Sequence, residues 1–417
     1  MFKPVLPLYY ARIFPFDEIH RWLSYGEDEL FLNREFALNF DGERFLRYQF
    51  YKDAAHLKRE IKSLRPTKID IGAIYNKPPK KLDRESIFPV NKEFIIDIDI
   101  SDYDDVRTCC SEANICNKCW KFMALAMQIL DEAFREDFGF QHILWTFSGR
   151  RGVHCWVCDE SARQLKKQTR FSVASYLQVV TGGVYRKKKV DLKEPIHPFV
   201  RRVLDRVQSI FIDMCVIEQN ILGTNEMVSK FLEILNNLSM RTEVHSIFKK
   251  YTTSLERWLA FVEFFRTKIN NGSEEWNEFP FLIEEIMLQY SYPRLDINVT
   301  LGLTHLLKSP FSVHPDTGKI GIPLDIKTIE NFDIKLVPNV FDIFDQVDAY
   351  DLKAKNQAMA GQVNKKVSEI EKTNLNQYLK TFREFIDELE KDKTEKEMKE
   401  EIITESQGLN DEYLLDT

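Results

Sequence analysis

The most constraining feature of this sequence is the alternating run Phe94-Ile95-Ile96-Asp97-Ile98-Asp99-Ile100. On an extended strand the apolar residues at even positions face one way, because successive side chains point to opposite faces. Asp97 and Asp99 then share the other face, with Cα atoms about 6.6 Å apart at a rise of about 3.3 Å per residue. Two carboxylates at this separation can converge on one or two divalent cations.

A half-exposed strand with an acidic wet side produces the same pattern, so the metal interpretation needs a third carboxylate. The alternating run at residues 294–299 offers Asp296 on a second expected strand. Periodicity alone does not establish that the two strands lie side by side.

A second feature is a group of four cysteines within eleven residues. Four thiolates satisfy a tetrahedral structural zinc site. An iron–sulfur cluster and buried unligated thiols are the alternatives. Cys155 and Cys158 would point to opposite faces of a strand, and Cys215 lies inside an apolar helical run, so these three thiols are expected in the core. The clustered residues are Cys109, Cys110, Cys116 and Cys119.

A basic turn joins two expected strands at residues 143–147 and 153–157. Its sequence, Ser148-Gly149-Arg150-Arg151-Gly152, predicts a hairpin in which glycine permits a tight turn. Guanidinium groups bind phosphate oxygens through forked donors, so this turn suits a triphosphate, with a solvated basic turn as the alternative. His154 follows on the second strand. A later loop brings Lys308 and His314, for which a purely structural loop is the alternative.

The remaining signals predict an α+β fold over residues 1–190 and 291–350, interrupted by an all-helical subdomain at 191–290. Residues 351–417 predict an exposed, charged amphipathic helix and a frayed acidic C-terminal tail. We expect no membrane span, because the apolar runs are far shorter than about 20 residues. The proline-broken N-terminus does not resemble a signal peptide, so a reducing compartment is expected.

Charge is unevenly distributed along the 417 residues. The chain carries a net charge of −7, but residues 351–417 hold 16 acidic and 11 basic residues, so the first 350 carry only −2. Basic clusters at 150–151, 166–167 and 186–189 can therefore form local positive patches. The sequence contains no Gly-x4-Gly-Lys-Ser/Thr loop and no Gly-x-Gly-x-x-Gly turn, so a bound nucleotide would be held by charged side chains.

Taken in order, these motifs resemble the small catalytic subunits of eukaryotic DNA primase. The resemblance extends from about residue 8 to about residue 345 and implies an archaeo-eukaryotic primase fold with an inserted helical subdomain and a zinc-binding loop at 109–119. It implies RNA primer synthesis on single-stranded DNA. The matching segments are residues 8–12, 34–36, 47–49, 68–73, 97–99, 103–107, 148–154, 293–296 and 307–315.

The resemblance also implies roles for individual residues. Asp97, Asp99 and Asp296 would bind catalytic Mg²⁺ or Mn²⁺, and the four clustered cysteines would bind Zn²⁺. The residues implied to hold the triphosphate of the incoming nucleotide are Ser148, Arg150, Arg151, His154, Lys308 and His314. Those implied to line the nucleotide and initiation region are Glu35, Arg47, Lys68 and Asp70.

Partners and location follow from the same resemblance. It implies a large, iron–sulfur-containing primase subunit, the DNA polymerase alpha complex, ribonucleoside triphosphates and a nuclear location. The basic segment 186–189 is expected to contact the DNA template. Phe45 stands where relatives carry tyrosine, and residues 350–417 follow no family pattern. The alternatives are a repair polymerase of the primase superfamily and an inactive scaffold of a replication complex.

Overall fold

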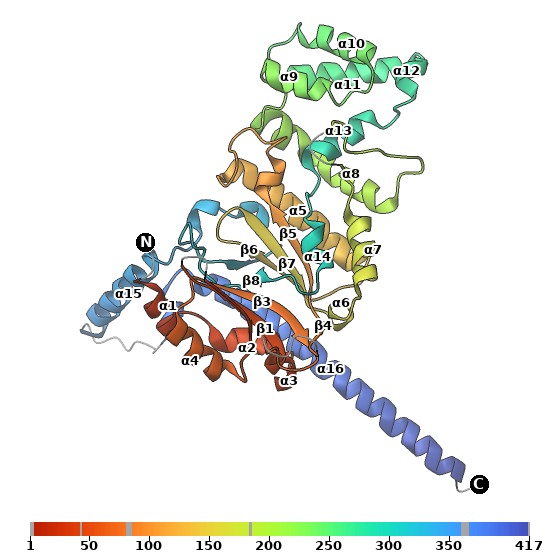
Figure 1. Cartoon of the computed structure of the whole chain (residues 1–417). Coiled ribbons are helices and arrows are strands. Elements are labelled where there is room, and N and C mark those ends of the chain that lie inside the picture. The colour runs from red at the N-terminus through yellow and green to blue at the C-terminus, as the bar shows by residue number, and fades with distance from the viewer. Residues whose placement is uncertain (1–3, 42–43, 81–85, 183–185, 360–366, 416–417) are drawn as a thin grey trace.

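Two antiparallel sheets form the centre of the molecule (Figure 1). The computed structural model describes residues 4–41, 44–80, 86–182, 186–359 and 367–415. The first sheet has the order β2-β1-β3-β4, with β8 also paired to β3, and the second has the order β5-β7-β6-β9. The strands are β1 (Arg34–Asn39), β2 (Phe45–Gln49), β3 (Lys68–Tyr75), β4 (Pro89–Asn91), β5 (Phe94–Asp99), β6 (Ile143–Phe147), β7 (Gly152–Val157), β8 (Leu307–Lys308) and β9 (Ile322–Leu324).

The second sheet confirms the predicted hairpin and the alternation of its acidic strand. β6 and β7 pair directly, and β5 pairs with β7 so that Asp97 lies opposite His154. The apolar face of β5 is fully buried. Helix α5 (Asn117–Glu136) covers this sheet, with the Phe134 ring 5.9 Å from that of Phe94. Burial of one face leaves the carboxylate face of the strand for a site.

Four short helices pack against the first sheet. The Phe31 ring on α3 lies 5.6 Å from the Phe36 ring on β1, which fixes the helical layer to the sheet. Asp53 begins α4 by accepting a hydrogen bond from the His56 amide at 2.7 Å, as an N-cap residue does. The helices are α1 (Leu6–Arg12), α2 (Phe16–Ser24), α3 (Asp28–Leu32) and α4 (Ala54–Leu64).

Residues 198–291 form the helical region at the top of Figure 1, without a strand among them. Ring contacts such as Phe211 with Trp258, at 4.9 Å, supply its own apolar core. Thr253 and Glu256 cap α11 reciprocally. The elements are α8 (Pro198–Phe211), the π-helical turn η3 (Ile212–Glu218), α9 (Asn225–Leu232), α10 (Leu238–Phe248), α11 (Ser254–Asn270), α12 (Glu274–Asn277) and α13 (Leu282–Ser291).

The remaining described elements connect these parts. Helices and strands are thus mixed along the chain, and the α+β fold class is confirmed. They are α6 (Glu160–Arg163), α7 (Lys167–Leu177), α14 (Ile297–Leu301), α15 (Asp342–Met359), α16 (Asn376–Leu415) and the 3₁₀ turns η2 (Ile100–Tyr103), η4 (Ile329–Asn331), η5 (Ile334–Leu336) and η6 (Ile370–Lys372).

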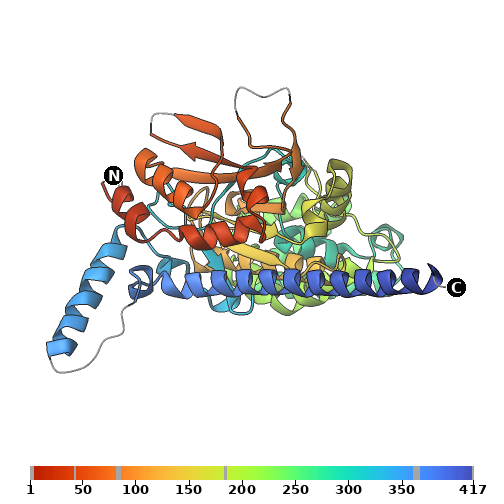
Figure 2. The same cartoon turned by 90° about the horizontal axis from the view of Figure 1, so that it is seen from below.

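Helix α16 differs from the exposed helix that the sequence predicted. Its apolar stripe is buried, and the Phe382 ring lies 5.7 Å from the Trp22 ring of α2. Arg383 donates to Glu18 at 2.6 Å, which joins the same two helices by charge. Figure 2 shows α16 running beneath the body and beyond it, as a helix to Leu415 where a frayed end was predicted. The buried stripe comprises Leu375, Leu379, Phe382, Ile386 and Leu389.

Candidate active site

The two acidic residues of β5 lie on one face of the strand, as the alternation predicted. Asp99 is held firmly: one carboxylate oxygen accepts hydrogen bonds from the amide and hydroxyl of Ser101, both at 2.9 Å. Its other oxygen lies 2.5 Å from Nε of Arg151. Asp97 lies 3.7 Å from Nε2 of His154 on the neighbouring strand. The hairpin therefore brings the basic turn directly beside the acidic strand.

Asp296 reaches the same place by a different local structure. The sequence predicted a strand there, but Asp296 is the N-cap of helix α14 and accepts from the Asn298 amide at 3.0 Å. The strand prediction is wrong because a side chain that caps a helix competes with extended pairing. The Asp296 amide donates to the Asp97 carbonyl at 3.2 Å, and this bond joins the cap to β5.

Asp102 on the turn η2 adds a fourth acidic group, for which the sequence motifs predict no role. Burial and, next, the charges of Asp99, Asp296 and Asp97 raise the pKa of Asp102 to about 6. Burial and the charges of Asp99 and Asp296 likewise raise the pKa of Asp97 to about 6. The available signal was the density of three aspartates within residues 97–102.

The carboxylate oxygens of Asp97, Asp99 and Asp296 are the kind of ligand that suits a divalent cation such as Mg²⁺ or Mn²⁺. Hard cations prefer carboxylate oxygens, and a bound cation removes the mutual repulsion that raises these pKa values. Without such a cation, ionising Asp97 costs the folded protein free energy.

The basic turn is closed by its own hydrogen bonds. Ser148 donates its amide to the Gly152 carbonyl at 2.9 Å and accepts from the Gly152 amide through its hydroxyl at 3.1 Å. Gly149 has a φ of +87°, and an added Cβ would meet Nζ of Lys308 at 3.1 Å. Lys308 donates to the Ser148 carbonyl at 2.6 Å, and Arg150 to Asp316 at 2.5 Å. Glycine is therefore required where β8 approaches the turn.

A hollow of about 420 Å³ brings these groups together. Acidic residues of β5 form one side and the basic turn and β8 form the other. His305 and Asp316 also line it and were not predicted. The predicted residues along its wall are Lys68, Asp70, Asp97, Asp99, Ser148, Arg150, Arg151, His154, Lys308 and His314.

The basic side of the hollow is held partly uncharged. Burial, followed by the charge of Lys308, lowers the pKa of both His154 and His314 to about 3. Burial, followed by Lys68, lowers the pKa of Lys308 to about 7. An anion placed among these groups would raise all three pKa values. The wall is therefore suited to a strongly charged anion such as a polyphosphate.

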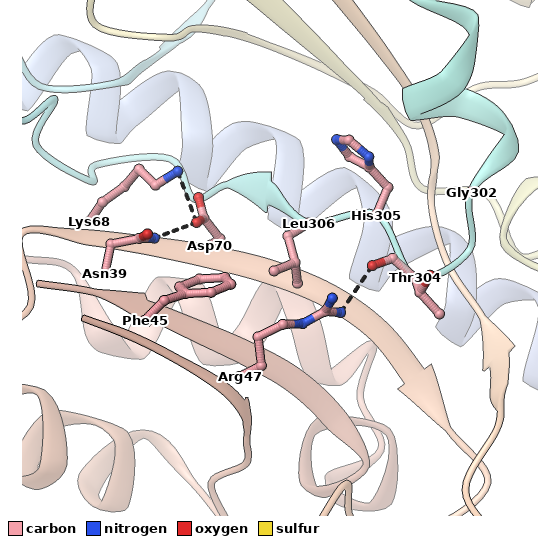
Figure 3. A pocket seen from close by; sticks show the side chains of 9 residues that line it. All are labelled: Asn39, Phe45, Arg47, Lys68, Asp70, Gly302, Thr304, His305 and Leu306. Carbon is pink, nitrogen blue, oxygen red and sulfur yellow. Dashed lines mark hydrogen bonds and ion pairs between the residues drawn. The ribbon is translucent and has the colours of Figure 1, made fainter. Parts of the chain in front are cut away.

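A second hollow, of about 450 Å³, adjoins the first and shares Lys68, Asp70, His305 and Leu306 with it (Figure 3). Asn39 donates to Asp70 at 2.7 Å, and Lys68 lies 3.0 Å from the same carboxylate. Phe45 exposes 45% of its surface here. The lining residues to which the sequence assigned no role are Asn39, Phe45, Gly302, Thr304, His305 and Leu306.

Glu35 lies behind this hollow and does not line it. Its buried carboxylate accepts two hydrogen bonds from Arg47, at 2.9 and 3.1 Å, and one from Tyr75 at 3.0 Å. Arg47 also donates to the Thr304 carbonyl at 3.1 Å. The carboxylate therefore orients Arg47 toward the loop that closes the hollow.

The four clustered cysteines lie around the start of α5. Their sulfur atoms all lie within 4.8 Å of one another, and those of Cys116 and Cys119 are 3.9 Å apart. Tetrahedral zinc with bonds of about 2.3 Å requires sulfurs about 3.8 Å apart, so the set fits a metal such as zinc. A hydrogen bond from Cys119, as the largest cause, lowers the pKa of Cys109 to about 5. Gln219 at the end of η3 donates to Cys109 at 3.5 Å, so the helical region contacts the cluster.

The basic segment 186–189 does not form the free patch that the sequence predicted. Lys187, Lys188 and Lys189 lie 2.8, 2.8 and 2.6 Å from Glu233, Glu285 and Asp105 respectively. Acidic residues brought in from distant segments thus neutralise the cluster. That this segment contacts a DNA template stays a prediction.

The chain is similar to known proteins along most of its length. The family described as DNA primase small subunit matches residues 96–326. The chain is 38% identical to the DNA primase small subunit of Drosophila melanogaster over 93% of this chain and 92% of that protein. It is 36% identical to that of Saccharomyces cerevisiae over 80% and 83%, and 23% identical to the small subunit PriS of Thermococcus sibiricus over 72% and 82%. Within the described residues, we find no helix long and apolar enough to span a membrane.

Proposed function

The chain belongs to the DNA primase small subunit family, the catalytic subunits of primer synthesis in replication, and on that premise we propose that it joins ribonucleotides on single-stranded DNA by two-metal nucleotidyl transfer. The observation that carries the proposal is the meeting of Asp97, Asp99 and the basic turn in one hollow of about 420 Å³. A polymerase needs this combination, because a cation and a triphosphate must be held side by side.

Asp97, Asp99 and Asp296 would hold Mg²⁺ or Mn²⁺. A cation bound there would lower the pKa of the attacking ribose 3′-hydroxyl and offset charge at the α-phosphorus. In the reaction the 3′-hydroxyl gives up its proton to water and its oxygen forms a bond to the α-phosphorus. The bond from that phosphorus to the bridging β-phosphate oxygen breaks, and pyrophosphate leaves. The carboxylates supply the negative charge that keeps cations in place.

The opposite wall would hold the triphosphate. Forked guanidinium donors of Arg150 and Arg151 and the ammonium of Lys308 would bind its oxygens, and neutralise charge on the departing pyrophosphate. Because Arg151 lies 2.5 Å from Asp99, we propose that it exchanges this contact for phosphate when cation and nucleotide enter together. Ser148, His154 and His314 would complete the wall.

The second hollow would take the sugar and base. Asp70 presents a carboxylate already fixed by Asn39 and Lys68, and such an oriented acceptor can receive a ribose hydroxyl. Phe45 offers an exposed aromatic face for stacking, without a hydroxyl. Arg47 and Glu35 would shape this region from beneath.

The further parts of the proposal rest on family membership and on the cysteine geometry. The name small subunit implies a larger partner subunit. We propose that this partner carries iron and sulfur, that the pair works with DNA polymerase alpha in the nucleus, and that the cysteines hold structural Zn²⁺. Residues 1–190 and 291–350 would act as the catalytic domain, 191–290 as a helical subdomain, and 351–417 as an accessory segment.

The direct test is RNA synthesis by the purified chain on unprimed single-stranded DNA with ribonucleotides and Mg²⁺ or Mn²⁺. We expect short RNA products. Extension of supplied ends only, with deoxynucleotides preferred, would instead indicate a repair polymerase of the same superfamily. No product even with a primer and the large subunit present would contradict the proposal and favour a scaffold.

The low pKa of Lys308 gives a second expectation. At pH 8 much of this buried ammonium is deprotonated in the free protein, because its pKa lies near 7. A bound triphosphate raises that pKa, so binding takes up a proton and the affinity falls as pH rises above 7, by up to about tenfold per unit. Calorimetry of ATP binding in buffers of different ionisation enthalpy measures this uptake. The Lys308→Met variant should lose it, and equal uptake by the two proteins would contradict the assignment.

A further inference from the structure

Lys92 is a buried lysine that none of the steps above uses. It lies between β4 and β5, exposes 1% of its surface, and donates a hydrogen bond from its ammonium to the His305 carbonyl. His305 belongs to the loop 302–306, which is distant in sequence. The contact therefore joins the start of the acidic strand to a separate part of the site.

The backbone around Lys92 is held from several sides. Its amide donates to the Arg163 carbonyl at 3.0 Å, and the buried Arg170 donates to the carbonyls of Lys92 and Glu93. The Glu93 carboxylate is engaged by Arg34, with two bonds of 2.8 Å. The lysine thus extends from a fixed base, and its acidic neighbour in sequence is already paired with another cation.

The loop 302–306 forms the wall shared by the two hollows. His305 and Leu306 line both of them, and Gly302 and Thr304 line the one drawn in Figure 3. The loop follows α14, which Asp296 begins, and precedes β8, which carries Lys308. A shift of this loop would therefore move the wall on which the proposed nucleotide rests.

Two basic side chains hold this loop through adjacent carbonyl groups. Arg47 donates to the Thr304 carbonyl at 3.1 Å from the side of the first sheet, and Lys92 donates to the next carbonyl. Glu35 orients Arg47 from below. Neutral peptide carbonyls accept both hydrogen bonds, so the arrangement restrains the backbone without a carboxylate entering the hollow.

Burying Lys92 is costly. Burial is the largest cause that lowers its pKa to about 7, and Arg170 and Arg34 act in the same direction against the opposing charges of Glu93 and Glu35. An apolar residue of similar size would avoid this cost in a purely structural position. Groups retained at such cost often serve a site.

We propose that Lys92 is a positioning residue that fixes the 302–306 loop as the wall of the nucleotide pocket. The expected change in KM rests on the proposed function, whereas the expected loosening of the 302–306 loop does not. Pairing with β7 holds Asp97 and Asp99 on β5, so we expect the loss to fall mainly on nucleotide binding.

The test compares Lys92→Met with the wild-type chain in extension of a primed DNA template. We expect the KM for the incoming ribonucleotide to rise about tenfold, with kcat changed less than about threefold, as loss of one buried hydrogen bond to the pocket wall implies. Lys92→Arg retains a cationic donor and should recover most of the affinity. The matched control is Lys393→Met, because Lys393 also donates to a backbone carbonyl, that of Tyr25 at 2.9 Å, away from both hollows. Its KM should stay at the wild-type value.

Hydrogen exchange gives a readout that does not depend on activity. Amides of residues 302–306 should exchange faster in Lys92→Met than in the wild-type chain or in Lys393→Met. Should Lys92→Met not fold, Lys92→Gln, whose amide is shorter, replaces it in both measurements. Unchanged KM, or equal impairment of the Met and Arg variants with unchanged exchange in the loop, would overturn the inference. A wild-type chain without any synthesis would instead overturn the proposed function, and exchange would still test Lys92.

Discussion

Replacing Asp97 by asparagine should lower primer synthesis by about 10³-fold or more while leaving the chain folded. A cation at this site supplies several kcal/mol of transition-state stabilisation, and asparagine removes one of the charges that would hold it. Activity on single-stranded DNA, measured beside Asp99→Asn, checks the expectation. The exposed Asp205 of α8 offers the matched control, and Asp205→Asn should retain full activity.

The same replacement should not destabilise the metal-free protein. The pKa of Asp97 is raised to about 6, so the protonated carboxyl stabilises the folded protein at low pH. This stabilisation is lost as pH rises through 6. Above pH 6 the neutral amide of asparagine avoids the cost of a buried charge that lies near Asp99 and Asp296. The melting temperature of Asp97→Asn should therefore equal or exceed that of the wild type. Thermal unfolding in buffer without Mg²⁺ or Mn²⁺, and without a chelator that would remove zinc, measures it. Near-normal primer yield from Asp97→Asn would refute the catalytic assignment.

Replacing Cys119 by serine should remove zinc and lower the melting temperature by about 10 °C. Serine is a poor zinc ligand, and a structural metal contributes directly to folding free energy. Elemental analysis of the purified protein should find about one zinc per wild-type chain and almost none in the variant. Iron with visible absorption in the wild type would instead indicate an iron–sulfur cluster.

The control for this variant is Cys215→Ser. Cys215 is equally buried, but it lies in the π-helical turn and outside the cluster. The Cys215→Ser variant can lose stability, because it places a hydroxyl in the core, but its zinc content should equal that of the wild type. Unchanged zinc in Cys119→Ser would remove the metal assignment.

Local patterns predicted the acidic strand and the basic hairpin well. A two-residue period and paired glycines act over neighbouring residues, and β5, β6 and β7 follow them. Asp296 was expected on a strand, because alternation over six residues does not distinguish a strand from a cap followed by one helical turn. Its place beside Asp97 depends on tertiary contacts that no local pattern contains.

Contributions from distant segments account for the other differences. Asp102 lies near the charges of Asp97 and Asp99 because the chain turns at η2, and His305 lines both hollows although it is distant in sequence from β3 and β5. The basic segment 186–189 looked free because the acidic partners of its lysines are distant in sequence. These partners are Asp105, Glu233 and Glu285. Helix α16 looked exposed because the residues that pack on its apolar stripe, such as Trp22 and Phe311, are distant from it in sequence.

That last contact has a consequence for how the chain is made. Trp22 and Glu18 emerge early during synthesis, yet the residues they contact, Phe382 and Arg383, follow about 360 positions later. At about 5–20 residues per second, a ribosome takes at least about 18 seconds to deliver them. During that interval α2 presents an uncovered apolar side, open to chaperones or to aggregation. Its native partner arrives only when translation is nearly complete.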